Sequence, residues 1–181
     1  MRKDAPGAPA GFTLVELMTT LAVAAILAGL AVPGMQRFLE WQRATGTMHA
    51  LTTQLALARN AAVSARTPVT LCPTRGGGRC AESTDWSTGW LLYRDPARLP
   101  QPRVPDDVLR DEHAPVHGSI RIFSTQGRVR VRYQPDGLAP GTNVTFRICS
   151  GERLHAEVVV NNSGRTRWAQ APADTPCGPP G

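Results

Sequence analysis

Residues 11–36 read GFTLVELMTTLAVAAILAGLAVPGMQ, an apolar segment from which most of the chain's organisation can be inferred. Its last 20 residues, Leu17–Gln36, carry no charge and are rich in leucine, valine and alanine. An α-helix needs about 20 mainly apolar residues to cross the hydrocarbon core of a bilayer. No second run of this kind occurs in the 181 residues. The sequence therefore predicts one membrane anchor near the N-terminus and a soluble remainder.

The apolar segment follows a short polar leader, which is not the arrangement of a secretory signal peptide. A secretory signal peptide has its apolar core before the cleavage site, so the core is removed. Here Arg2 and Lys3 open a short polar leader that ends at Gly11, and the apolar segment begins at Phe12. The string from Gly11 to Leu17 closely resembles the prepilin signal of type IV pilins and type II secretion pseudopilins. The resemblance implies that a prepilin peptidase cuts after Gly11, methylates Phe12, and leaves the helix as an inner-membrane anchor.

Glu16 is a carboxylate inside the apolar segment. A carboxylate at the centre of a membrane helix costs about 2.5–3.5 kcal/mol on insertion scales, so such a residue usually has a function. The alternative is a helix-end carboxylate that reaches the headgroups, since Glu16 lies only five residues after Gly11. The resemblance implies that Glu16 pairs with the methylated amino terminus of a neighbouring subunit. Two buried charges then become one ion pair, which sets the filament register.

The chain divides into a leader and three further segments. A helix is weakened at Pro33-Gly34, because proline removes one hydrogen bond and kinks the helix. Beyond this point apolar residues recur at helical spacing to about Ala65, which predicts a helix with one face packed on the soluble domain. We expect residues 1–11 to be the leader, 12–33 the transmembrane helix, 34–66 the amphipathic helix and 67–181 a β-rich domain. The resemblance places this domain in the periplasm.

From Thr67 onward the helical period is lost, and short apolar or alternating runs appear between turn sequences. The runs predicted as strands are 68–72, 89–94, 119–124, 128–134, 143–149 and 155–160. One long helix followed by six or seven short strands predicts an α+β, pilin-like fold with the helix packed on antiparallel β-sheet. The proline-rich stretch between Asp95 and Val116 is predicted as a surface loop with solvated acidic residues.

The four cysteines are Cys72, Cys80, Cys149 and Cys177. They allow three pairings, among which the sequence alone does not choose. Close Cys-x2–4-Cys spacing, which zinc sites favour, is absent. An exported domain lies in an oxidising compartment where disulfides persist. We favour the sequence-local pairs Cys72–Cys80 and Cys149–Cys177, with no metal site.

The soluble half is similar to the GspH/FimT branch of the pilin-like family. The matching pieces are Leu71–Pro73, Asp85–Asp95, Gln134–Gly137 and Gly164–Arg167. Within the second piece, Trp86 and Trp90 are predicted to pack in the core rather than to stack on nucleobases.

The chain is basic and almost all of its positive charge is arginine. There are 20 Lys+Arg against 14 Asp+Glu, a net charge of +6, and Lys3 is the single lysine. Residues 118–168 hold eight arginines against three carboxylates. This balance favours polyanionic partners, although charge alone does not separate nucleic acid from acidic lipid, and arginine over lysine also follows from a GC-rich genome.

Two arginine groups are candidates for DNA contact. Arg128, Arg130 and Arg132 alternate with apolar residues, so a strand would present all three on one face. An ordinary solvated face is the alternative. The second group is Arg165 and Arg167.

The string Gly164-Arg165-Thr166-Arg167 resembles a Gly-Arg-x-Arg motif that contacts DNA in FimT-type minor pilins. Arginines at i and i+2 on an extended segment point the same way and can bind successive phosphates. The segment precedes Cys177, whose disulfide would hold it. Two ordinary surface arginines are the alternative.

No nucleophile triad, paired carboxylates or phosphate-binding loop is visible, so we expect no enzyme and no cofactor. The sequence predicts a minor type IV pilin that joins other pilins through its N-terminal helix and binds DNA non-specifically during natural transformation. One alternative is a GspH-type pseudopilin of a type II secretion system, or a pilus-priming minor pilin, without DNA binding. A second is an anchored basic protein that binds acidic lipid or envelope polymer. We expect a single-pass inner-membrane protein that then enters a pilus or pseudopilus.

Overall fold

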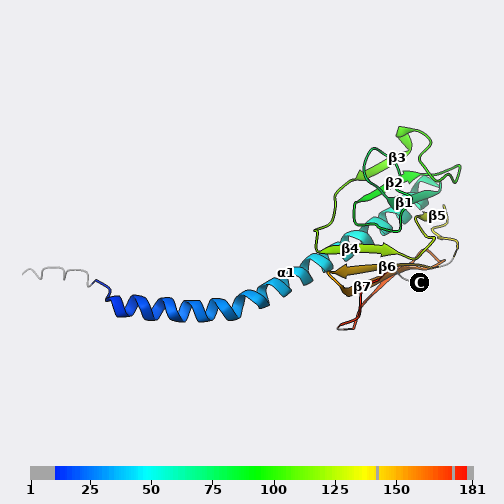
Figure 1. Cartoon of the computed structure of the whole chain (residues 1–181). Coiled ribbons are helices and arrows are strands. Elements are labelled where there is room, and N and C mark those ends of the chain that lie inside the picture. Colours follow the sequence, from blue (N-terminus) through cyan, green and yellow to red (C-terminus); the bar gives the residue numbers. More distant parts are fainter. Residues whose placement is uncertain (1–10, 142, 173, 179–181) are drawn as a thin grey trace, which may run out of the picture. The chain divides into compact units, whose positions relative to one another are not determined.

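The structure is a computed structural model that describes residues 11–141, 143–172 and 174–178. Residues 1–10 of the predicted leader therefore lie outside the described residues. One long helix is followed by short strands (Figure 1). The elements are α1 (Leu14–Ala65), β1 (Val69–Pro73), β2 (Trp90–Arg94), a short 3-10 helix (Pro105–Asp107), β3 (Val108–Glu112), β4 (Ile120–Ser124), β5 (Val131–Tyr133), β6 (Val144–Ser150), β7 (Arg153–Val160) and β8 (Thr166–Gln170).

The chain forms two compact units, one that ends at Leu39 and one that begins at Glu40, with α1 running through the boundary. In the first unit every described side chain is exposed, and most are apolar. Among the described residues, α1 is the one helix long and apolar enough to cross a membrane. Exposed apolar surface on this scale is unfavourable in water, so this segment needs lipid or other helices around it.

The second unit contains two four-stranded antiparallel sheets. The first has the order β3-β2-β1-β5 and the second β4-β6-β7-β8 (Figure 1). The strands β3, β5, β4 and β8 are therefore the sheet edges. The α+β class with antiparallel sheet is confirmed, although the sheet is divided in two.

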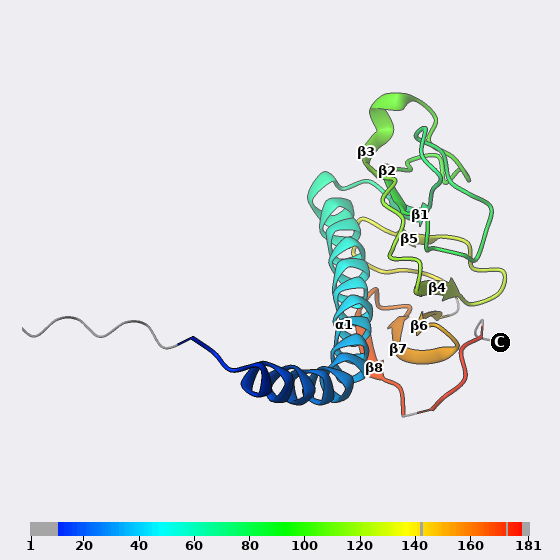
Figure 2. The ribbon, with the colours of Figure 1, turned by 60° about the vertical axis from the view of Figure 1, so that its left-hand side comes forward.

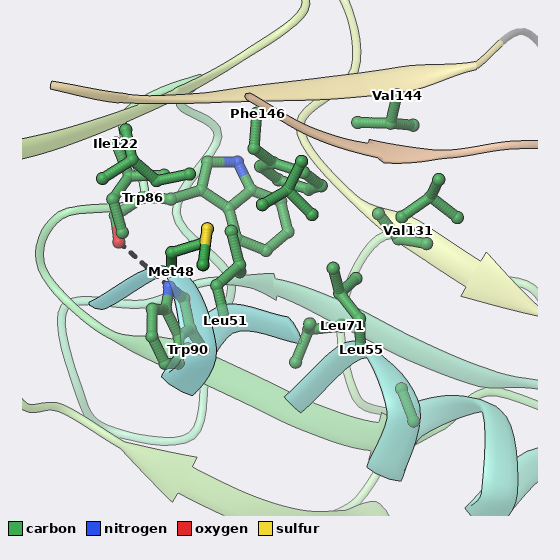
Figure 3. Packing of buried hydrophobic residues seen from close by; sticks show 14 of the residues in the cluster. Met48, Leu51, Leu55, Leu71, Trp86, Trp90, Ile122, Val131, Val144 and Phe146 are labelled. Carbon is green, nitrogen blue, oxygen red and sulfur yellow. Dashed lines mark hydrogen bonds between the residues drawn. The ribbon is translucent and has the colours of Figure 1, made fainter. Parts of the chain in front are cut away.

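The core lies between the C-terminal part of α1 and the two sheets. Met48, Leu51 and Leu55 of α1 are buried against residues of both sheets (Figure 3). Trp86 and Phe146 meet edge to face with ring centroids 4.8 Å apart. Full burial of such side chains contributes about 1.5–3 kcal/mol each. The described core belongs entirely to residues from Ala44 onward, and thus to the second unit.

The two tryptophans at 86 and 90 lie in this core, as predicted. Trp86 is fully buried and Trp90 is 8% exposed. The indole N–H of Trp90 donates to the Trp86 carbonyl at 3.0 Å, and the Trp86 N–H donates to Ser124 at 3.1 Å. Both polar groups are therefore satisfied, and neither ring is available to a nucleobase.

The proline-rich stretch after Asp95 was predicted as a loop with solvated acids, and this is wrong in part. It contains the edge strand β3, whose exposed and polar residues give no hydropathy signal. The Asp111 carboxylate accepts the Gly78 N–H at 2.8 Å. Glu112 accepts a hydrogen bond from Gln54 of α1 and pairs with Arg110. These two carboxylates therefore bond β3 to the glycine-rich loop at Gly78 and to α1 at Gln54.

The strand predicted over residues 128–134 is reduced to Val131–Tyr133, which pairs with residues 69–71 of β1. Arg128 instead closes a turn, its N–H donating to the Thr125 carbonyl at 3.0 Å. In addition, β8 forms where no strand was predicted.

Both disulfides join residues close in sequence. Cys72 of β1 is bonded to Cys80 across the glycine-rich loop, with Cα atoms 5.6 Å apart. Cys149 of β6 is bonded to Cys177 of the tail, with Cα atoms 5.8 Å apart. These are the two pairs that the sequence analysis favours, and they leave no cysteine free.

Candidate functional site

The first candidate region is the start of α1, around Glu16. The Glu16 N–H donates to the Thr13 hydroxyl at 3.2 Å, and the Thr13 N–H donates to the Glu16 carboxylate at 3.3 Å. This reciprocal pair is a capping box, which satisfies two N–H groups that the helix start leaves open. Gly11 and Phe12 precede it and are exposed. The Thr-x-x-Glu spacing of Thr13 and Glu16 is the sequence signal for this box.

The second candidate region is the β7–β8 hairpin, which carries Arg165 and Arg167. Thr166 and Arg167 pair with Val160 and Val159 of β7. The side-chain oxygen of Asn161 accepts the Arg165 N–H at 3.0 Å. A short turn closed by side-chain and backbone bonds thus holds the first arginine at the tip of the hairpin.

Gly164 has a structural reason to be glycine. Its φ of +70° lies in the left-handed region that disfavours side chains. A Cβ at this position would also lie 2.0 Å from the Gly137 carbonyl oxygen and 3.3 Å from the Tyr133 ring. Burial raises the pKa of that Tyr133 phenol to about 12, so it stays neutral beneath the turn. The residue therefore lets two turns pack in contact.

The hairpin is also bonded to its surroundings. The Arg59 guanidinium of α1 donates to the Gly137 carbonyl at 3.0 Å and to the Ser163 carbonyl at 3.4 Å. The Ala139 N–H donates to the Asn162 carbonyl at 3.0 Å. The turn before Arg165 is thereby fixed to both the preceding loop and the long helix.

The disulfide does not hold this segment, contrary to the sequence-based expectation. Cys149 pairs with Leu154 at the start of β7, whereas Arg167 pairs near the end of that strand. The C-terminal tail is also bonded to the start of β7, away from Arg167, since the Thr175 carbonyl accepts the Leu154 N–H at 2.8 Å. Sheet pairing and the turn, rather than the disulfide, therefore position the arginines.

Arg165 and Arg167 are both exposed. Because they are separated by one residue on extended chain, their side chains leave the same face of the hairpin. Among the described residues, neither guanidinium has a hydrogen bond or an ion pair. On that face of the sheet, the Glu157 carboxylate of β7 is already paired with Arg147 at 2.8 Å. The pair is thus free to meet a polyanion.

Alternation placed Arg128, Arg130 and Arg132 on one face as candidate DNA contacts, with an ordinary solvated face as the alternative. All three are half-buried, so they do not form an openly exposed face of either kind. Arg132 donates to the Asp95 carboxylate at 2.6 Å, and that side chain is 2% exposed. Arg130 pairs with Glu82 at 2.7 Å.

The Arg128 guanidinium packs against Gly141, where a Cβ would lie 2.8 Å from two of its nitrogens. This trio joins loops to the sheet edge. Among the described residues, no group of three or more His, Cys, Asp or Glu is placed to hold a metal ion.

Comparisons with known proteins place this fold in a family. A family model described as "Type II transport protein GspH" matches residues 47–164, and one described as "Prokaryotic N-terminal methylation motif" matches residues 8–32. Two crystal structures of the type IV minor pilin FimU from Pseudomonas aeruginosa match with TM-scores of 0.59 and 0.55 at 18% sequence identity. They cover 77% and 74% of this chain and 96% of FimU. Among curated proteins, none matches significantly.

The FimU match supports the fold, and the two family models account for most of the chain, from the segment before the anchor to the β7–β8 turn. Members of this family are structural subunits that are processed by prepilin peptidase and assemble with other pilins. The chain belongs to the GspH family of minor pilins and pseudopilins.

Proposed function

We propose that this chain is a minor type IV pilin that binds DNA without sequence preference through Arg165 and Arg167, and serves DNA uptake in natural transformation. The observation that carries the proposal is the exposed, unpaired arginine pair on a hairpin fixed to the long helix. Arginine binds phosphate through charge-assisted, often bidentate, hydrogen bonds. Because the pair is presented without a counter-charge, binding requires no ion pair to break first.

Two further features support DNA binding by this arginine pair. The two guanidinium groups leave one face, with Cα atoms about 6.7 Å apart for residues i and i+2 of a strand, so they can bind successive phosphates. The net charge of +6 attracts a polyanion over longer range. Contacts to phosphate carry no sequence information, hence the proposed lack of sequence preference.

The same proposal assigns the N-terminal residues. Prepilin peptidase would cut after Gly11 and methylate Phe12, and Glu16 would pair with the amino terminus of a neighbouring subunit. Residues 1–11 would be the leader, 12–33 the membrane span, 34–66 the remainder of the helix, and 67–181 the periplasmic domain. The subunit would wait in the inner membrane as a single-pass protein before entering the pilus.

The second candidate function is a type II secretion pseudopilin, or a priming minor pilin, that does not bind DNA. The description of the family model that matches residues 47–164 favours it. The two candidates differ in one measurable property, the affinity for DNA and its dependence on salt.

The test is a titration of the full chain, reconstituted in phosphatidylcholine nanodiscs, with a labelled DNA duplex at several salt concentrations. Changing Arg165 and Arg167 to Gln should flatten the slope of log affinity against log salt by about 1.8 units for the duplex, which corresponds to two lost phosphate contacts at about 0.9 each. The matched control changes Arg75 and Arg79, two other exposed arginines with no ion pair among the described residues. It removes the same charge and should leave the slope nearly unchanged.

An unchanged slope in the Arg165/Arg167 variant would instead favour the assembly-only function. Vesicles containing phosphatidylglycerol test the acidic-lipid alternative. If they bind the protein through the same arginines and DNA does not, the DNA proposal fails. In cells, the variant should lose transformation while pili still assemble.

A further inference from the structure

The edge strand β8 borders a pocket on the face opposite Arg167. The pocket measures about 240 Å³ and lies between α1 and the strands β7 and β8, which run side by side in Figure 2. Its lining includes Trp41, Thr45 and His49 of α1, His155 of β7, and Trp168 and Gln170 of β8. All of these residues belong to the second unit.

Two of the four tryptophans stand at this pocket, and both are open to solvent. Trp168 is 53% exposed and Trp41 is 45% exposed, in contrast to the buried Trp86 and Trp90. Trp168 meets His49 edge on, with ring centroids 6.2 Å apart, and Trp41 meets His155 in the same way at 6.2 Å. Each indole packs against one histidine ring, and part of its surface stays exposed to solvent.

Trp168 follows Arg167 directly, so the two side chains leave opposite faces of β8. Trp168 lies across from Val158, which is buried in the core, whereas Arg167 lies across from Val159. The strand is a sheet edge, since β7 is the one described strand that pairs with β8. A flexible polymer lying along this edge can therefore contact guanidinium groups on one face and an indole ring on the other.

We propose that this pocket binds an unpaired nucleobase of a single DNA strand whose phosphates contact Arg165 and Arg167. The inference rests on the proposed function, and it names single-stranded DNA as the preferred form. Every base has a π-face that can stack on an aromatic side chain. The polar groups at the pocket, His49, Gln170 and the Thr45 hydroxyl bonded to His155 at 3.1 Å, can meet the edge of a base.

The charge of the neighbouring residues argues for this occupant. The apolar pocket and the arginines lie on opposite faces of the same sheet edge, with Trp168 next to Arg167 in the chain. A nucleic acid strand that passes round this edge offers the matching combination of a flat apolar ring and a phosphate. In a duplex the bases are stacked inside and reach a side pocket only after unpairing, which costs a few kcal/mol. The arginines can bind the phosphates of single-stranded and duplex DNA alike, but the pocket can bind a base only from a single strand.

The experiment compares a short oligothymidylate with a duplex of equal length, both titrated against the full chain in phosphatidylcholine nanodiscs. Trp168→Ala should weaken binding of the single strand by about 5- to 150-fold, the loss of one base stack, and should leave duplex binding unchanged. Trp168→Phe should retain most of the affinity because it keeps an aromatic face. The oligothymidylate should quench tryptophan fluorescence more strongly in the unchanged protein than in Trp168→Phe.

Leu109→Ala is the matched control, since Leu109 is an exposed apolar residue on the other sheet's edge strand β3. It should change neither titration. Equal losses for both DNA forms in Trp168→Ala, or no loss for either, would overturn the pocket proposal. So would unchanged DNA binding with loss of the variant from sheared pili, because the pocket would then be a contact between subunits. Failure of the Arg165/Arg167 variant to weaken either form would instead overturn the proposed function itself.

Discussion

The carbonyl oxygen of Gly137 occupies the space that a side chain on Gly164 would need. A Cβ on Gly164 would lie 2.0 Å from that oxygen, well inside van der Waals contact. The glycine of the Gly-Arg-x-Arg string is therefore needed for packing between two turns, and the arginines owe their position to it. Its role does not depend on any contact with DNA.

The first prediction follows from this contact. Gly164→Ala should destabilise the fold more than Gly151→Ala, although both glycines have a positive φ. Gly151 has no atom within 4 Å of its ideal Cβ, so its change costs only the left-handed backbone, about 1–2 kcal/mol. Displacing the Gly137 turn should add about 1–3 kcal/mol. Urea unfolding of the two variants measures the difference, and equal midpoints would contradict the packing argument.

The second prediction concerns processing. Gly11→Val should leave an uncleaved precursor in the membrane, because the peptidase would lose its cleavage residue. Glu16→Ala should still be cleaved but should be missing from sheared pili, visible by immunoblot of pilus and membrane fractions. A mature-size product from Gly11→Val would refute the assigned cleavage site.

Thr13 gives a control for Glu16. Thr13→Ala removes one half of the capping box and should cost about 0.5–2 kcal/mol of helix stability, while the carboxylate remains. It should therefore assemble better than Glu16→Ala. If both variants fail equally, the capping role of Glu16 explains its importance without a partner subunit.

The third prediction concerns the ion pair between Arg132 of β5 and Asp95. Arg132→Gln leaves the Asp95 carboxylate buried with the Thr70 hydroxyl and the Leu99 N–H as its remaining side-chain hydrogen-bond partners among the described residues. Loss of one partner of a buried pair costs up to about 3–5 kcal/mol. Exposed changes such as Arg167→Gln should stay within about 0.5 kcal/mol. Thermal unfolding should separate the two, and equal stabilities would show that the Asp95 pair contributes little.

The helix over Leu17–Gln36 could be predicted from sequence, because its length and lack of charge are typical of a long apolar helix. The ion pair between Arg132 and Asp95 could not be predicted, since it depends on the pairing of β5 with β1, which brings the two side chains together. Likewise, nothing near Gly164 in the sequence indicates that Gly137 will meet it. Local patterns predict local elements, whereas these contacts join residues 27 or more positions apart.

The strands β3 and β8 were missed for a related reason. Both are sheet edges whose side chains are mostly exposed, so neither has the alternation that burial of one face imposes. Central strands such as β6 and β7 were predicted within two residues of their observed ends, because one face of each is buried. The candidate DNA-contact residues lie at an edge, where sequence pattern is least informative.

The fourth prediction concerns the cysteines. Peptide mapping without reductant should recover Cys72 joined to Cys80 and Cys149 joined to Cys177. Chain entropy predicts about 2–3 kcal/mol of stabilisation from the shorter loop and about 3–4 kcal/mol from the longer one. Replacing Cys149 and Cys177 by Ser should lower stability yet preserve DNA affinity, because Arg165 lies at the other end of the sheet. Loss of affinity in a folded variant would contradict that separation.

The fifth prediction is a pH dependence of stability. Burial lowers the pKa of His155 from 6.5. Below about pH 6.5 the unfolded chain therefore takes up a proton that the folded chain resists, and stability falls as the pH decreases toward the lowered pKa. Above this range His155 is neutral in both states and contributes no slope. Urea midpoints of His155→Gln should vary less with pH than those of the unchanged protein, and an equal variation would exclude this histidine as a source.

The bonds from Arg59 have a mechanical consequence. Tension on a DNA strand held by Arg165 and Arg167 would pull on β8 and on the turn before it. Arg59 ties that turn, through the Ser163 carbonyl, and its neighbour, through Gly137, directly to α1. Force would therefore pass from the hairpin into the same continuous helix that carries the apolar anchor, without crossing the sheet or either disulfide.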